Sequence, residues 1–401
     1  MLFTSTQNQK NLPRYFSRVF DMACNMNFGQ LDFALSDGRV FRAIGRNQGP
    51  IAQLNIHNPD IFARLIREGD LGFCDAYLDQ WWSTPDLQAF MDLIHADNDD
   101  LYDGFPGMAL VRFYEKFRFW LQRNSKKQAL KNISYHYDLG NDFYQLWLDE
   151  TMTYSSALFK TGQESLENAQ LAKYASMVEQ MDVQSGDHIL EIGCGWGGFA
   201  EYAAKEHGLR VTGLTLSNEQ IVFARERIEA LGLSDLVEFK LQDYRDETGQ
   251  YDGIASIEMF EAVGQKYWPS YFKVLRDCLK PGRHATLQII TVQDARWDVY
   301  QRGVDFIQKY IFPGGMLPSP SVLRTEIETA GLNVVRSLEF GESYSQTLRR
   351  WHDVFNKKWD QVAALGFDER FRRMWNFYLT SCAATFSSSN CEVTQITVTN
   401  R

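Results

Sequence analysis

The chain has 401 residues, more than one ordinary hydrophobic core needs, so we expect two domains. Hydrophobic residues make up 44% and charged residues 23%, which excludes wholesale disorder. The net charge of -10 argues against nucleic acid as a partner, and no apolar run reaches the roughly 18 residues of a membrane span. Six scattered cysteines and the lack of a secretory pattern at the N-terminus predict reduced thiols in a cytoplasm.

Residues 1–109 are predicted to form a small domain of mixed strands and helices. An alternating apolar stretch at 31–35, a Ser-Asp-Gly turn and an apolar pair at 40–41 predict a hairpin. Asn58 and Pro59 predict the cap and the first turn of a following helix. This part of the sequence predicts no particular chemistry.

A basic and aromatic segment, residues 110–131, is predicted to be a linker helix. It contains seven Lys or Arg residues and one Glu, interleaved with aromatic side chains at Phe113, Phe117, Phe119 and Trp120. Such a helix can lie at a membrane surface, where the rings are buried and the cations meet phosphates. It can also pack its aromatic side on protein between two domains, and both interpretations stay open.

From residue 132 to residue 401, strands alternate with helices. Residues 171–181 carry apolar side chains on one helical face, and apolar strands are expected at 188–192, 210–216, 237–241, 254–257 and 285–291. This order predicts an α/β fold with a mostly parallel sheet that is covered on both faces. Such sheets bind ligands beyond the carboxyl ends of their strands.

A glycine-rich loop follows the first of these strands. Glycine lets the backbone turn tightly and approach a ligand closely. The order G-C-G-W-G-G also fits the G-x-G-x-x-G spacing of dinucleotide-binding loops, which leaves a nicotinamide cofactor as the alternative. A strand ending E-I-G-C-G-W-G resembles the first motif of the class I methyltransferases, which implies S-adenosylmethionine as the cofactor. The cofactor residues expected here are Glu191, Gly193, Cys194, Gly195 and Gly197.

The next two strands end in further candidates for the cofactor site. The second strand does not end in an acidic residue that could bond the ribose hydroxyls. We therefore expect Thr215 or a neighbouring group to make some of these hydrogen bonds. Asp243 and Tyr244 are candidates for contacting the adenine amine and ring. Asp243 as a solvated loop acid remains an alternative.

Five further stretches carry a family resemblance. They are H-Y-D-L-G-N-D-F-Y from His136, M-T-Y-S-S from Met152, M-F-E-A-V-G from Met259, Y-I-F-P-G-G from Tyr310 and Y-L-T-S-C-A from Tyr378. Together with the glycine loop, they resemble the cyclopropane-fatty-acyl-phospholipid synthases and the related mycolic acid modifying enzymes, over roughly residues 130–390.

This resemblance implies a Rossmann-like class I methyltransferase domain at 132–401, and a more weakly matched lipid-associated domain at 1–109. It implies methyl transfer to the double bond of an unsaturated fatty acyl chain, followed by loss of a proton and closure of a cyclopropane ring. The intermediate cation needs a dry pocket lined by aromatic faces. The expected cofactor site is extended to Tyr154, Ser155, Leu216 and Gln220.

The resemblance also implies that a bound bicarbonate ion accepts the proton. The corresponding positions in this chain are Ser156, Glu261, Gln288, Ile290 and Tyr378. Ser156 stands where the family has a cysteine, and Gln288 stands where it has a histidine. Both can donate hydrogen bonds to an anion, but glutamine does not titrate near neutral pH.

Three alternatives to a cyclopropane product remain. Proton loss elsewhere gives a methyl-branched or methylene chain, as in fatty acyl C-methyltransferases. A lipid-binding protein without activity would have lost the loop glycines, which are present here. A small-molecule N- or O-methyltransferase would need a base, for which His136 is the candidate, or a metal, for which no ligand spacing exists in the sequence.

The implied substrate predicts the partners of the chain. Phospholipid acyl chains lie in a bilayer, so we expect a cytoplasmic protein in peripheral contact with the inner face of the membrane, docked through residues 110–131. No nucleic acid or metal is expected, and the family resemblance suggests a homodimer.

Overall fold

The computed structural model describes residues 1–96 and 139–400. The predicted linker helix at 110–131, together with His136 and Tyr137, lies outside the described residues. The described chain forms a 5-stranded sheet with the order β1-β3-β2-β4-β5 and a 7-stranded sheet with the order β11-β12-β10-β9-β6-β7-β8. Among the described residues, no helix has the length and apolar character that crossing a membrane requires.

The smaller sheet contains the predicted hairpin. Its strands are β1 (Leu2–Phe3), β2 (Phe28–Ala34), β3 (Val40–Ile44), β4 (Asn47–Ile56) and β5 (Trp82–Ser83). β2 and β3 pair antiparallel with Phe33 opposite Phe41, which confirms the hairpin. Three helices accompany this sheet: α1 (Phe16–Ala23), α2 (Ile61–Leu78) and α3 (Leu87–Ala96).

The predicted start of α2 was wrong by two residues. The helix begins at Ile61 with Asp60 at the N-cap position, so Pro59 precedes the helix instead of lying in its first turn. The Asn58 side chain accepts a hydrogen bond from the Asp60 amide at 2.9 Å. Asn58 therefore closes a turn before the helix, a local bond that asparagine makes as readily as a helix cap.

The larger sheet confirms the predicted mostly parallel order. β6 (His188–Ile192), β7 (Arg210–Thr215), β8 (Val237–Leu241), β9 (Tyr251–Ile257) and β10 (Leu279–Val292) correspond to the five expected strands. These five strands pair in parallel. Two unpredicted strands, β11 (Asn333–Glu339) and β12 (Cys391–Thr399), extend the sheet: β12 pairs antiparallel with β10, and β11 pairs antiparallel with β12.

Helices cover both faces of this sheet. Ile189 of β6 packs in one hydrophobic cluster with α7 (Leu166–Met181), α8 (Gly198–His207) and α9 (Asn218–Ala230). Leu190 packs in a second cluster with α10 (Trp268–Cys278) and α13 (Pro320–Thr329). Neighbouring residues of a strand point to opposite faces, so a continuous apolar run is buried on both sides.

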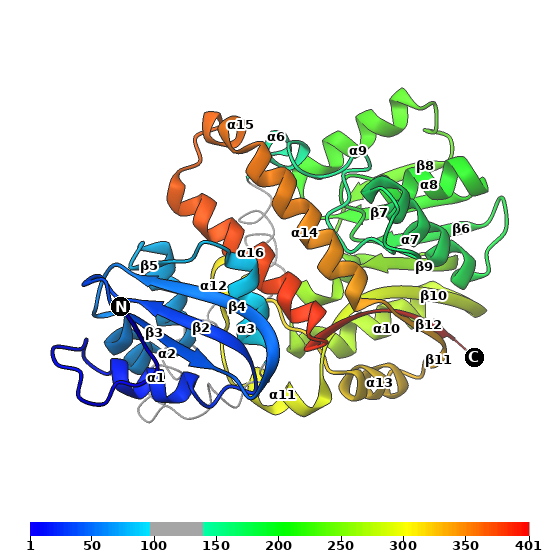
Figure 1. Ribbon diagram of the computed structural model, residues 1–401. Coiled ribbons are helices and arrows are strands. Elements are labelled where there is room, and N and C mark those ends of the chain that lie inside the picture. The colour runs from blue at the N-terminus through cyan, green and yellow to red at the C-terminus, as the bar shows by residue number, and fades with distance from the viewer. Residues whose placement is uncertain (97–138, 401) are drawn as a thin grey trace.

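Two long helices lie between the sheets (Figure 1). They are α14 (Gly341–Lys357) and α16 (Glu369–Ser387), joined through the short α15 (Trp359–Ala364). One hydrophobic cluster extends from the smaller sheet through these helices to the region of the larger sheet. The remaining short elements are α6 (Asn141–Gln145), α11 (Asp294–Tyr300), α12 (Phe306–Tyr310), η1 (Tyr244–Asp246), η2 (Phe260–Ala262) and η3 (Gln265–Tyr267).

Polar contacts join α16 to the smaller sheet and to α2. The Arg373 guanidinium donates to the carbonyl oxygens of Tyr77 at 2.7 Å and Trp82 at 3.0 Å. It also stacks over the Tyr77 ring, 3.8 Å from the centroid. The C-terminal helix and the N-terminal part therefore share one core. The division into domains at 109 and 131 falls in residues outside the described part and stays a prediction.

Candidate active site

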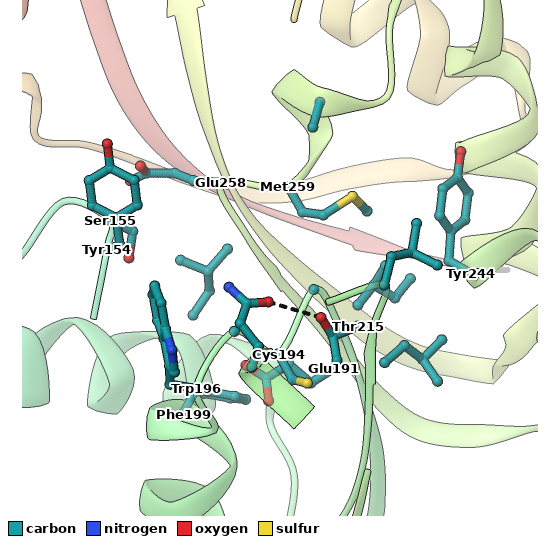
Figure 2. Close-up of a pocket in the computed structure, with 18 of the residues that line it drawn as sticks. Tyr154, Ser155, Glu191, Cys194, Trp196, Phe199, Thr215, Tyr244, Glu258 and Met259 are labelled. Carbon is teal, nitrogen blue, oxygen red and sulfur yellow. Dashed lines mark hydrogen bonds between the residues drawn. The ribbon is translucent and has the colours of Figure 1, made fainter. Parts of the chain in front are cut away.

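A cavity of ≈ 180 Å³ lies at the carboxyl ends of the parallel strands. Its walls come from the loop after β6, the ends of β7 and β9, residues 242–245 after β8, and the segment 152–155. Figure 2 shows Tyr154, Ser155 and Glu258 on one side of this cavity and Thr215 and Tyr244 on the other. The cavity therefore lies where an α/β sheet binds its ligand.

The glycine loop forms the floor of this cavity. Gly193 has φ +86°, and a Cβ at this position would lie 2.7 Å from the Met259 side chain. At Gly195 an added Cβ would meet nothing within 4 Å, so the backbone faces open space there. Gly193 and Gly195 line the cavity, together with Cys194, whereas Gly197 precedes α8 at its N-cap position and is not part of the wall.

Glu191 lies at the end of β6 and lines the same cavity. It is 3% exposed, and its Oε2 has no hydrogen-bond partner among the described residues. Burial raises the pKa of Glu191 to about 8, although the nearby Lys173 acts in the opposite direction. A buried carboxyl oxygen without a donor is a site for a ligand N–H group.

The predicted residues after β7 are held together by hydrogen bonds. Thr215 Oγ1 donates to Gln220 Oε1 at 2.9 Å, as the dashed line in Figure 2 shows, and it accepts from the Ser217 amide at 3.1 Å. Leu216, which lies between Thr215 and Ser217 in the sequence, also lines the cavity. Thr215 and Gln220 thus present fixed polar groups to a ligand.

Asp243 and Tyr244 follow β8 and also line the cavity. The Asp243 carboxylate accepts from Arg245, with Nε–Oδ1 at 2.8 Å and Nη2–Oδ2 at 2.5 Å. The Asp243 side chain is 9% exposed, so the alternative of a solvated loop acid is wrong. Its ion pair with Arg245 fixes the carboxylate at the cavity wall.

A buried lysine connects the segment 152–155 to α7. Lys173 is fully buried, and its ammonium donates to Ser155 Oγ at 2.7 Å. Burial lowers the pKa of Lys173 to about 7, while Glu258, Asp149 and Glu191 act in the opposite direction. A buried charge of this kind persists only with partners, which these carboxylates and Ser155 provide.

Tyr154 lies at the edge of a cluster of aromatic rings. Its hydroxyl is 2.7 Å from the hydroxyl of Tyr378 on α16. The Tyr154 ring centroid is 5.3 Å from that of Trp351 and 5.5 Å from those of Tyr144 and Trp147. Phenyl and indole faces carry negative charge density, and they exclude water from this side of the cavity.

The described aromatic residues of the other family stretches do not line this cavity. Phe143 is fully buried and packs edge-on against Trp147. Phe312 lies 6.3 Å from both Tyr154 and Tyr378, whereas the Tyr310 hydroxyl bonds Asp75 of α2.

A family profile described as mycolic acid cyclopropane synthetase matches residues 124–396. The chain belongs to this family. A relative in Mycobacterium tuberculosis, tuberculostearic acid methyltransferase UfaA1, is 38% identical over 378 residues, covering 92% of this chain and 87% of the relative. The cyclopropane-fatty-acyl-phospholipid synthase of Escherichia coli K12 is 36% identical over 360 residues, covering 88% of this chain and 89% of the relative.

A solved structure extends the likeness to the fold. The mycolic acid cyclopropane synthase CmaA1, complexed with SAH and CTAB, superposes with a TM-score of 0.63 and 30% identity, over 67% of this chain and 98% of that one. The class I methyltransferase fold and the family resemblance are thereby confirmed. This member of the mycolic acid cyclopropane synthetase family is an S-adenosylmethionine-dependent methyltransferase of a lipid-modifying type.

The cavity of this family member fits S-adenosylmethionine. The open space over Gly195 accommodates a ligand close to the backbone, and Glu191 offers an oxygen without a partner for an amino group. Thr215, Gln220 and Asp243 line the wall where a nucleoside would lie. The individual contacts of these residues with the cofactor remain predictions. Among the described residues, no group of three or more His, Cys, Asp or Glu side chains is placed to hold a metal.

Hydrogen bonds join four of the five predicted anion-binding residues in two pairs, Ser156 with Gln288 and Glu261 with Ile290, and their hydrogens are used within the protein. Ser156 Oγ donates to the Ala157 carbonyl at 2.9 Å. The Gln288 Nε2 donates to Glu258 Oε1 at 2.8 Å and to the Ser156 carbonyl at 3.3 Å. The Ile290 amide donates to Glu261 Oε1 at 2.6 Å.

Three of the donors predicted for bicarbonate already bond acceptors of the protein itself. An anion site needs N–H or O–H groups aimed at it, and those of Ser156, Gln288 and Ile290 already have protein acceptors. The Tyr378 hydroxyl pairs with Tyr154. Glu261 Oε2 has no partner among the described residues, and burial together with the charge of Glu258 raises the pKa of Glu261 to about 8.

The sequence did not predict Lys173, Arg245 or Glu258 at this site. Glu258 stands one residue before the M-F-E-A-V-G stretch, and its acidic side chain directly after a buried strand was the available signal. Lys173 had a similar signal, a polar residue on the buried face of α7. Their roles depend on neighbours brought in from other elements.

Proposed function

We propose that this chain transfers the methyl group of S-adenosylmethionine to a double-bond carbon of an unsaturated fatty acyl chain carried by a phospholipid. The aromatic cluster around Tyr154 and Tyr378, next to the cofactor cavity, is the observation that carries this proposal. An alkene that takes up a methyl cation leaves a positive charge on carbon. Aromatic faces stabilise such a charge, and water would destroy it.

S-adenosylmethionine supplies an electrophilic methyl group when it is bound. The residues of this chain place the acyl double bond, exclude water and accept a proton. Trp351 and Tyr144 flank the Tyr154 ring, and the hydrogen bond to Tyr378 fixes the ring orientation. A fixed ring needs no rearrangement as the charge develops, which is how a preorganised site lowers a barrier.

Two products are candidates. Closure of a cyclopropane ring follows from the family resemblance and is the reaction named for the Escherichia coli relative. A methyl-branched or methylene chain is the second candidate. It is supported by the relative named as a tuberculostearic acid methyltransferase, and by the departure at Gln288, whose side-chain amide bonds Glu258 in this chain.

The product decides between the two candidates. Purified protein would be incubated with S-adenosylmethionine that carries a trideuterated methyl group and with vesicles of cis-monounsaturated phospholipid. Gas chromatography and mass spectrometry of the released fatty acids then report the label. A saturated ring with two deuteriums means cyclopropanation, and an alkene with three deuteriums means methyl branching. An exocyclic methylene has two deuteriums and is distinguished by hydrogenation. If no lipid carries the label, the result contradicts the proposed function.

A phospholipid substrate places this chain at the inner face of the cytoplasmic membrane, in peripheral contact with the bilayer. The proposed dock is residues 110–131, which lie outside the described residues. Changing Arg112, Lys116, Arg118 and Arg123 to Glu should abolish flotation with anionic vesicles. Undiminished flotation would contradict a dock in this segment. A homodimer is part of the same proposal, and sedimentation velocity tests it.

A further inference from the structure

Glu258 is placed at the cavity wall by an unusual backbone conformation. It follows β9 directly, and its φ of +49° lies in the left-handed region that side chains other than glycine rarely adopt. Such strained positions persist where the surrounding structure holds them, and they gather at functional sites. The strain turns the side chain into the site: Glu258 lines the cofactor cavity and extends toward Tyr154 in Figure 2.

The Glu258 carboxylate is held by donors from three other elements. Its Oε1 accepts from the Ser156 amide and from Gln288 Nε2, both at 2.8 Å. Tyr344 of α14 also hydrogen-bonds this carboxylate. The Gln288 amide is itself oriented, because its Oε1 accepts from Gln395 Nε2 at 3.1 Å. Two donors on one oxygen stabilise the ionised form of a carboxyl group.

Gln288, one of the two departures from the family pattern, thus contacts Glu258 through its side chain. Ser156 and Gln288 both contact Glu258, Ser156 through its backbone amide and Gln288 through its side chain. A carboxylate of the chain occupies the donors that a free anion would otherwise use. The site therefore contains its own anion.

The pKa values of two neighbouring carboxyl groups, Glu258 and Glu261, are both raised by burial. Burial and the charge of Glu258 raise the pKa of Glu261 to about 8, so Glu261 is mostly protonated at neutral pH. Burial also raises the pKa of Glu258, but Gln288, the Ser156 amide, Lys173 and Tyr344 all act against that shift. Within the pair, Glu258 accepts from two donors and has Lys173 nearby, whereas Glu261 accepts from the Ile290 amide.

The contacts of Tyr344 relate Glu258 to the aromatic cluster. Tyr344 bonds Glu258, and its ring lies edge-on to Trp351, whose ring centroid is 5.3 Å from that of Tyr154. The carboxylate is thus near the rings that we propose to face the acyl cation, and it also lines the cofactor cavity. Glu258 therefore borders both the cofactor cavity and the aromatic cluster.

We propose that Glu258 is the general base of this reaction, an inference that rests on the proposed function. Its carboxylate accepts the proton that the methylated acyl cation loses. The C–H bond breaks, and its electron pair forms the new bond of a cyclopropane ring or of a double bond. The proton forms the O–H bond of neutral Glu258, and no further reactant is needed.

The main test is Glu258→Gln, which keeps an oxygen for the Ser156 amide but cannot take up a proton at neutral pH. We expect labelled-lipid formation to fall by on the order of 100-fold or more, the usual contribution of a general base. Binding of S-adenosylhomocysteine should change by less than about threefold. The matched control is Glu238→Gln on β8, whose side chain is 67% exposed, and it should keep full activity.

A second variant covers the case in which Glu258→Gln binds the cofactor poorly. Glu258→Gly relieves the positive φ and leaves the donors of Ser156 and Gln288 facing a space of carboxylate size. Added formate should then restore activity in a saturable manner. Wild-type activity should also be unchanged in buffer freed of bicarbonate.

The possible results separate the inference from the proposed function. A wild-type enzyme that labels no lipid contradicts the function itself. An active wild type with Glu258→Gln within threefold of its rate overturns the role of Glu258, as does a wild type that needs bicarbonate. Loss of activity in both variants without rescue by formate also overturns it.

Discussion

The hydroxyl oxygens of Tyr154 and Tyr378 lie 2.7 Å apart, although 224 residues separate them in the sequence. Tyr154 belongs to the segment before α7, and Tyr378 lies on the penultimate element of the chain, α16. Tyr378 is 3% exposed, so its hydroxyl has little access to water and depends on Tyr154 for a partner. The bond joins the wall of the cofactor cavity to the helix that packs on the smaller sheet.

We expect Tyr378→Phe to lower the rate of methyl transfer without weakening cofactor binding. The ring remains, but Tyr154 loses the hydroxyl that fixes its orientation. The expected loss is about tenfold in kcat, equivalent to ~1.4 kcal/mol of transition-state stabilisation. Labelled-lipid formation measures the rate, and calorimetry with S-adenosylhomocysteine measures binding. The control is Tyr202→Phe on α8, outside the cavity wall, and an unchanged kcat in Tyr378→Phe would contradict this role.

Glu191→Gln is expected to weaken binding of S-adenosylmethionine. The Glu191 Oε2 has no protein partner, so a ligand N–H that binds there makes a hydrogen bond to a group able to carry charge. Such a bond contributes about 1.5–3 kcal/mol, which corresponds to a Kd raised roughly 10- to 100-fold. Isothermal titration calorimetry measures this change. Glu206→Gln, on the exposed side of α8, is the control, and equal Kd values for both variants would refute the role of Glu191.

The stability of the cofactor-free protein should decrease as the pH rises from about 4.5 to about 7. Glu191 and Glu261 have ordinary pKa values of 4.5 that burial raises to about 8 in the folded protein. A raised pKa means that the folded state holds protons which the unfolded state has released, so stability is greatest below 4.5 and is lost as the pH rises through about 8. Above about 7 the lowered pKa of Lys173 acts in the opposite direction, which limits the window.

Thermal unfolding across this pH window provides the measurement. Tm should fall with rising pH in the wild-type protein, and Glu191→Gln and Glu261→Gln should each flatten the dependence. Glu238→Gln should leave the slope of the wild type intact. A wild-type Tm that rises steadily from pH 4.5 to 7 would show that these two carboxyl groups do not dominate the pH dependence of stability.

Arg373→Met is expected to destabilise the protein by about 2–3 kcal/mol, because it removes two charge-assisted hydrogen bonds and the contact with the Tyr77 ring. Urea unfolding followed by tryptophan fluorescence measures the change. Arg324→Met on an exposed position of α13 is the control. If the two variants are equally stable, Arg373 does not hold α16 to the smaller sheet.

Much of the larger sheet was predictable because its strands are local apolar runs with turn signals between them. The five parallel strands, the glycine loop and the helix after it were all expected from these patterns. β12 was missed, because its pairing with β10 joins residues about a hundred positions apart, such as Gln288 and Gln395. Non-local pairing of this kind leaves no local signature.

In the candidate site, too, local sequence patterns were predictable and contacts between distant segments were not. Residues within continuous motifs, such as Glu191 and Gly195, were expected from the sequence and line the cavity. Lys173 and Glu258 were missed because their roles come from partners on other elements, Ser155 for the lysine and Gln288 for the glutamate. The bicarbonate site stays a prediction of the resemblance, and in this arrangement the hydrogens of Ser156, Gln288 and Ile290 have acceptors within the protein.

The placement of α16 constrains how this chain can be recombined with its relatives. Arg373 contacts the smaller sheet and Tyr378 contacts Tyr154, and both residues lie on this one helix. An exchange of the N-terminal part between two family members would therefore mismatch a helix encoded some three hundred positions later. Functional chimaeras need both segments from the same parent. Substitutions in the smaller sheet should accordingly covary with those on the face of α16 that packs against it.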